Sequence, residues 1–106
     1  MTMAKANINA GICGFSTTVI AEAEGMRKCA VKIASDCQHI QNLAEQLTEV
    51  DPMQEISFRR GTPKTMELAA EYCAHAACPV PAGIIKTIEV ACNLALPADA
   101  EIKINK

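Results

Sequence analysis

The sequence predicts an α+β fold: a two-layer sandwich in which a three-stranded antiparallel meander precedes three helices and a closing fourth strand, in the order βββαααβ. Three observations predict it. Apolar and polar residues alternate through the first third of the chain, apolar residues recur at helical spacing in the middle, and alternation returns after Pro97. Strands grouped before helices are typical of α+β domains. At 106 residues the chain has the length of one domain, residues 1–106.

The first two strands are predicted to form a hairpin. Residues 5–12 and residues 15–24 each alternate between apolar and polar side chains, as half-buried strands do. A two-residue turn at Cys13-Gly14 would set Ile8 opposite Val19 and keep the apolar side chains of both strands on one face.

A third strand is predicted at residues 27–34, after a three-residue loop at 24–26. This loop would set Val19 opposite Val31 and bring the apolar sets of the two strands together. The first third of the chain is therefore a meander.

A helix is predicted over residues 36–48. Ser35, followed three residues later by Gln38, forms the capping-box pattern of a helix N-terminus. Its buried face shows the i, i+3, i+4, i+7 spacing and consists of Ile40, Leu43, Ala44 and Leu47.

Proline-containing signals place the remaining helices. Asp51-Pro52 predicts a single helical turn through about residue 56, and Thr62-Pro63 predicts a helix to about His75. The connection at 76–81 leads into a third helix, which runs to about Leu94.

Residues 100–104 alternate between apolar and polar side chains and predict the closing strand. The helices would then cover one face of a four-stranded sheet.

The composition narrows the class of partner. The 10 basic and 12 acidic residues are well mixed and give a net charge of -2, and aromatic residues make up only 3%. Both facts argue against a nucleic acid or an anionic membrane as partner. The chain shows no signal-peptide pattern and no membrane-length apolar stretch, so we expect a cytoplasmic protein with reduced thiols. A protein partner or a homo-oligomer stays open.

Six cysteines are the most informative feature of the sequence. When the chain is followed through short connections, cysteines from four separate places fall at one end of the predicted sandwich: Cys13, Cys37, Cys73 and Cys78. Cys29 and Cys92 fall on inward faces and are assigned to the core.

These positions suit a soft-metal site. Cys37 and Cys78 sit at or just before predicted helix N-termini, which favour a thiolate. Cys13 shares a tight turn with Gly14, where backbone N–H groups can approach a bound cluster. Thiolates suit Zn²⁺ or an iron-sulfur cluster, although no spacing here is CxxC. We predict Cys13, Cys37 and Cys78 as ligands, with Cys73 either the fourth ligand or a core residue.

Two other classes of function stay open. A thiol-dependent enzyme or redox protein would use a low-pKa thiolate, Cys37 or Cys78. An interaction or oligomerisation module would contain purely structural cysteines. His39 and His75 fall on predicted outward faces, so we expect solvated side chains there rather than ligands.

The basic run at residues 59–64 precedes a predicted helix N-terminus and could hold a phosphate or carboxylate. A solvated loop is the simpler interpretation. Asp36, beside Cys37, is likewise explained by helix capping rather than by a role as a base.

Three stretches carry a resemblance to known proteins: Gly11-Ile12-Cys13-Gly14-Phe15, Ser35-Asp36-Cys37 and Cys78-Pro79-Val80-Pro81. With them, the chain resembles over nearly its whole length a family of small uncharacterised proteins of anaerobic bacteria and archaea. No activity is attached to that family, so the resemblance implies no catalytic residue. An anaerobic setting would suit an oxygen-sensitive cluster.

Overall fold

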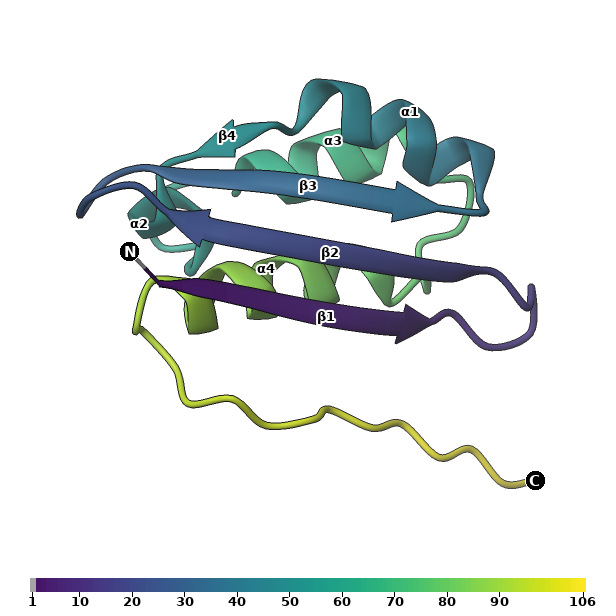
Figure 1. Cartoon of the computed structure of the whole chain (residues 1–106). Coiled ribbons are helices and arrows are strands. Elements are labelled where there is room, and N and C mark those ends of the chain that lie inside the picture. Colours follow the sequence, from purple (N-terminus) through teal and green to yellow (C-terminus); the bar gives the residue numbers. More distant parts are fainter. Residues whose placement is uncertain (1) are drawn as a thin grey trace.

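The structure, a computed structural model, describes residues 2–106 and consists of one antiparallel sheet with four helices (Figure 1). The sheet has the order β1-β2-β3-β4. Its strands are β1 (Met3–Asn9), β2 (Ser16–Ala23), β3 (Cys29–Ser35) and β4 (Glu49–Val50). The helices are α1 (Gln38–Gln46), α2 (Pro52–Glu55), α3 (Lys64–Tyr72) and α4 (Val80–Ala91). The α+β class and the order of the first elements are confirmed.

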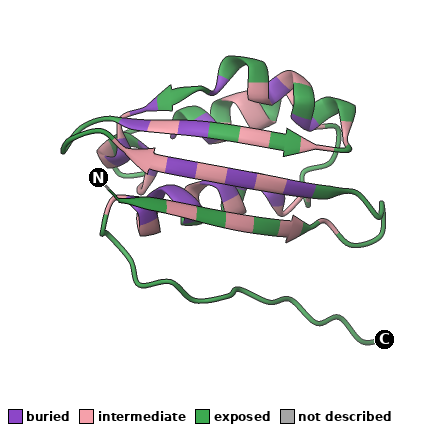
Figure 2. Cartoon of the chain, in the orientation of Figure 1, coloured by how far each residue is buried: buried purple, intermediate pink, exposed green. Residues whose placement is uncertain are grey.

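The predicted faces of the first three strands are correct. Buried and more exposed residues alternate along β2 and β3, as Figure 2 shows. Val19, Ala21 and Val31 point into the core, while Lys5 and Lys32 lie on the exposed side of the sheet. The two-residue period of a strand therefore assigned the inward side chains correctly.

Both predicted registers are wrong by two residues. Ile8 pairs with Thr17 rather than Val19, because the first turn contains four residues, 11–14, instead of two. The Gly14 N–H donates to the Gly11 carbonyl at 2.9 Å, and both glycines have positive φ, 94° and 74°.

The second loop has the predicted length of three residues but lies one residue later in the chain. Val19 pairs with Ile33 rather than Val31, and the loop consists of residues 25–27. The Glu24 N–H donates to the Lys28 carbonyl at 2.8 Å across the mouth of this loop. A slip of two residues leaves every side chain on its predicted face, which is why the core was still identified.

The closing strand at residues 100–104 is absent, and that prediction is wrong. Residues 96–106 are extended and exposed without strand pairing. The fourth strand is instead β4, which pairs with β3 through Cys29 and Val50. Alternation marks an amphipathic segment, but it carries no information on which sheet edge the segment can reach.

The capping box predicted for the first helix is also wrong. Ser35 is still paired with Thr17 in the sheet, and its hydroxyl lies 2.8 Å from that of Thr17. The hydroxyl accepts the Cys37 N–H at 3.1 Å, so the helix begins later, with Cys37 as its N-cap and Gln38 as its first residue.

Helix α4 forms the centre of the core. It contacts β1 and β2, and its inward residues are Val80, Ile84, Ile88 and Ala91. A Cβ on Gly83 would collide with the side chain of Ile8, so the glycine lets the helix approach β1 closely. With few aromatic residues available, the layers must lie close together to exclude water.

A buried carboxylate caps α3. Glu55 is 1% exposed, and its oxygens accept the backbone N–H groups of Lys64 at 2.8 Å and Thr65 at 2.9 Å. The Thr65 hydroxyl donates to the same carboxylate. The protein's own anion therefore occupies this helix N-terminus, which agrees with treating residues 59–64 as a loop rather than an anion site.

We expect Glu55→Ala to lower the free energy of unfolding by about 3 kcal/mol, because it leaves buried donors of α3 without a partner. Urea denaturation followed by circular dichroism measures this. Glu45→Ala, at an exposed position of α1, serves as the control and should change stability by less than about 0.5 kcal/mol. Equal stabilities of the two variants would show that the cap is unimportant.

Candidate functional site

Cys37 lies where β3 ends and α1 begins. Asp36 holds this junction to β2: its N–H donates to the Ser16 carbonyl at 3.2 Å, and its carboxylate accepts the Ser16 N–H at 3.3 Å. Asp36 therefore joins two strands and does not cap the helix. As the N-cap of α1, half-buried Cys37 sits among unpaired backbone N–H groups that favour negative charge.

Cys73 and Cys78 flank the connection between α3 and α4. Cys73 is the C-cap of α3, and its N–H donates to the Ala69 carbonyl at 2.9 Å. Cys78 ends a turn in which its N–H donates to the His75 carbonyl at 3.3 Å, and Pro79 then caps α4. Both thiols are half-buried and pack against the core.

The thiols of Cys37 and Cys78 both act on that of Cys73. The pKa of Cys73 is raised to about 11, first by burial, then by the charges of Cys78 and Cys37, and finally by hydrogen bonding with Cys78. A charge acts in this way only over a short distance. The structure therefore brings together three of the four cysteines that the sequence places at one end of the fold, and we call them the thiol cluster.

Cys13 occupies the same end of the sheet but is set apart from the thiol cluster. It lies in the turn that joins β1 and β2, beside the end of β3, and it is exposed. It is not among the groups that act on Cys73. Its approach to the thiol cluster would require movement of the turn.

The arrangement of the thiol cluster is not that of a preformed metal site. Within residues 2–106, no group of three or more His, Cys, Asp or Glu side chains is positioned to hold a metal ion. His39 and His75 are exposed, as predicted. Any metal bound here would have to draw the thiols together.

A second pair of thiols lies at the opposite end of the fold. Cys29, at the start of β3, is fully buried, and half-buried Cys92 follows the last turn of α4. Burial, followed by the charge of Cys92, raises the pKa of Cys29 to about 12. The assignment of both residues to the core is correct, but their contact with each other was not anticipated, because it joins segments far apart in the sequence.

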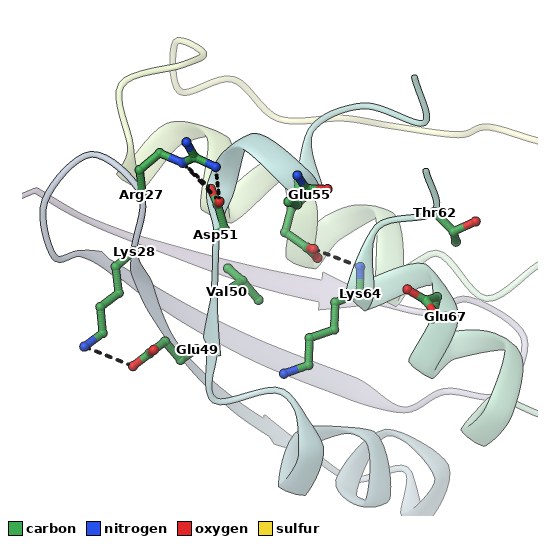
Figure 3. A pocket seen from close by; sticks show the side chains of 10 residues that line it. Arg27, Lys28, Glu49, Val50, Asp51, Glu55, Thr62, Lys64 and Glu67 are labelled. Carbon is green, nitrogen blue, oxygen red and sulfur yellow. Dashed lines mark hydrogen bonds and ion pairs between the residues drawn. The ribbon is translucent and has the colours of Figure 1, made fainter. Parts of the chain in front are cut away.

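A hollow of about 570 Å³ lies away from the thiol cluster, at the end where β3 begins (Figure 3). Four of its charged side chains form two ion pairs. The Arg27 guanidinium lies 2.6 Å from a carboxylate oxygen of Asp51, and Lys28 Nζ lies 3.3 Å from a carboxylate oxygen of Glu49. Hydrogen bonding to Arg27 holds the pKa of Asp51 below its usual range. Glu55, in the same wall, caps α3, so most of the charged groups of this hollow serve the fold.

Sequence reasoning missed the two carboxylates of this wall, Asp51 as an ion-pair partner and Glu55 as a buried cap. Asp51 was recognised only as the N-cap of α2, where it accepts the Met53 N–H at 3.0 Å. Glu55 stands in a polar stretch and carries no periodic signal of burial. The only available hint was the helix start at Thr62-Pro63, which lacks an acidic partner of its own.

Comparison of the sequence with known proteins assigns the chain to a family. Residues 4–104 match a family of unknown function, DUF6951. The chain belongs to this family. No curated protein and no solved structure matches it. The resemblance to an uncharacterised family is thus confirmed, and membership assigns no activity. In addition, none of the helices described for this family member is long and apolar enough to cross a membrane.

We expect alkylation by iodoacetamide at neutral pH to label Cys13 first and Cys29 and Cys73 last. Cys13 is exposed, whereas the raised pKa values of about 12 and about 11 leave Cys29 and Cys73 almost wholly as unreactive thiols. Labelling of Cys73 should accelerate as the pH rises towards about 11. Peptide mass spectrometry resolves the sites, and rapid labelling of Cys73 at pH 7 would contradict the assignment.

Proposed function

We propose that this protein binds a soft metal centre, Zn²⁺ or an iron-sulfur cluster, through the thiolates of Cys37, Cys73 and Cys78. The observation that carries the proposal is that Cys78 and Cys37 both act on Cys73, where they add to the effect of burial in raising its pKa. They come from the start of α1, the end of α3 and the loop before α4. Thiolate groups in this number favour zinc or iron over oxygen-preferring cations.

Electrostatics explains why a metal would stabilise the thiol cluster. Two or three thiolates at short range repel each other, and this repulsion contributes to the raised pKa of Cys73. A bound cation reverses the balance: it favours the thiolates, and protons are released as it binds. Metal affinity should therefore rise with pH.

The proposal ranks Cys73 ahead of Cys13, the reverse of the expectation from sequence. Three thiolates leave a further coordination position, which a substrate, a partner's ligand or Cys13 could fill. Cys13 has the necessary freedom, because its turn is exposed and bounded by two glycines with positive φ. The anaerobic origin implied by the resemblance would suit an oxygen-sensitive cluster.

We expect anaerobically purified protein to contain zinc, or iron with sulfide, at about one site per chain. Elemental analysis and the absorption spectrum identify which. Cys37→Ser and Cys73→Ser should each lose most of the metal, because each removes a ligand. Cys92→Ala, at the opposite end of the fold, is the matched control and should retain it. Cys13→Ser then shows whether the β1–β2 turn supplies a further ligand.

Two results would contradict the proposal. One is wild-type protein that contains no metal and whose melting temperature does not rise with added Zn²⁺, since a ligand that binds the native state must stabilise it. The other is equal loss of metal in Cys92→Ala and Cys37→Ser.

A dithiol redox function is the second candidate, and one observation favours it. Cys78 acts on Cys73 by hydrogen bonding as well as by charge, whereas Cys37 acts by charge alone. Cys73 and Cys78 could therefore exchange with a disulfide substrate: one thiolate attacks the substrate, and the second displaces it, which leaves a Cys73–Cys78 disulfide and two substrate thiols. Reaction with oxidised glutathione separates the candidates. A Cys73–Cys78 disulfide in protein that binds no metal would favour the redox function.

A further inference from the structure

The outer edge of β1 is unpaired. Among residues 2–106, β2 is the only strand that pairs with β1. Towards β2, the Ala23 N–H donates to the Thr2 carbonyl at 2.9 Å, and the Ala10 N–H donates to the Phe15 carbonyl at 3.2 Å. Because alternate residues of an antiparallel strand bond to the same neighbour, the backbone groups of Met3, Lys5, Asn7 and Asn9 face outward. Such an edge readily pairs with another strand.

Residues 98–104 have the sequence pattern of a strand but pair with no other strand of the described chain. Apolar and polar residues alternate along them, and the large apolar side chains are exposed: Ile102 by 79% and Ile104 by 88%. In the described chain, residues 96–106 make no hydrogen bond to any other segment, and their one ion pair, Lys103 with Glu101, is internal. An exposed segment of this pattern needs a partner surface to bury its apolar face.

The chain's own β1 cannot accept this segment in the antiparallel direction. The Ala91 carbonyl accepts a hydrogen bond from Thr2, so α4 ends beside the N-terminal end of β1. The N–H groups of Leu94 and Ala95 donate to the Glu89 carbonyl at 2.8 and 3.3 Å, which ties the chain to α4 that far. The next three steps, to Ala98, span about 11 Å at most. Antiparallel pairing would have to start at the far end of the 7-residue β1, about 23 Å away.

The segment therefore runs in the same direction as its own β1, as Figure 1 shows, in a sheet that is antiparallel throughout. Pairing with β1 of a second copy would instead allow the segment to be antiparallel to its neighbour. A twofold axis perpendicular to the sheet reverses the partner's β1, so the segment of one copy is antiparallel to β1 of the other, and the exchange is reciprocal.

We propose that residues 98–104 of each copy pair with β1 of a second copy and that this strand exchange forms a homodimer. Setting Lys5 opposite Glu101 places opposite charges together on the exposed face. The same register sets Ala4 opposite Ile102 and puts the apolar side chains of both strands on the face that α4 covers. The partner is thus a second copy of this chain.

Sedimentation equilibrium of the full chain tests the proposal. We expect a dimer at micromolar concentration and a monomer after Ile102→Asp with Ile104→Asp, or after removal of residues 97–106, because these changes act on the exchanged strand alone. The melting curve measured by circular dichroism should remain cooperative, since this segment contributes nothing to the core. Lys86→Glu, a charge reversal on an exposed face of α4, is the control and should leave the dimer intact.

A charge exchange tests the register. Glu101→Lys should raise the dimer dissociation constant about tenfold, because each dimer contains two such pairs. Adding Lys5→Glu to Glu101→Lys should restore the original value. A monomeric full chain, or a dimer that persists without residues 97–106, overturns the proposal. Failure of the double exchange to restore the dimer overturns the register.

Discussion

Helix α4 packs its apolar face against the inner face of β1 and β2, and the other elements are arranged around this contact. Ile84 and Ile88 are fully buried in the same core as Val19 and Ala21, and Gly83 lets the helix approach Ile8 closely. The direction of α4 sets the two ends of the molecule. Its N-terminal end follows Cys78 and the thiol cluster. At its C-terminal end, the Ala91 carbonyl accepts a hydrogen bond from Thr2, and the exposed residues 96–106 follow. The thiol cluster and the start of the proposed exchanged strand therefore lie at opposite ends of α4.

The sequence predicted which side chains point inward far better than how the strands pair. A strand has a two-residue period, so any register displaced by two residues preserves the faces, and the core residues Val19, Ala21 and Val31 were found despite two wrong registers. The displacement came from the length of the first loop and from the position of the second. The four-residue turn at 11–14 depends on two glycines in the left-handed region, and a sequence with Gly at both positions allows several turn types.

The candidate site was predictable as a location but not as a geometry. Short antiparallel connections were enough to place Cys37, Cys73 and Cys78 at one end of the fold. They could not show that Cys73, on an apparent core face, interacts with both of the others, because this depends on how α3 and α1 pack against each other. Tertiary packing also explains why residues 100–104 form no strand in this chain, although their pattern is that of a strand. They leave α4 in the same direction as β1, so they cannot pair antiparallel with the free edge of their own sheet.

The central claim is that three thiolates from separate elements close around one soft metal ion. Anaerobic titration with Co²⁺ tests it most directly, because the thiolate-to-cobalt charge-transfer absorption grows with the number of thiolate ligands. The account predicts saturable binding at about one Co²⁺ per chain. The absorption per bound ion should fall by about a third in Cys37→Ser and remain unchanged in Cys92→Ala. Absence of this absorption in the wild-type protein, or the same spectrum in wild type and Cys37→Ser, would contradict the account.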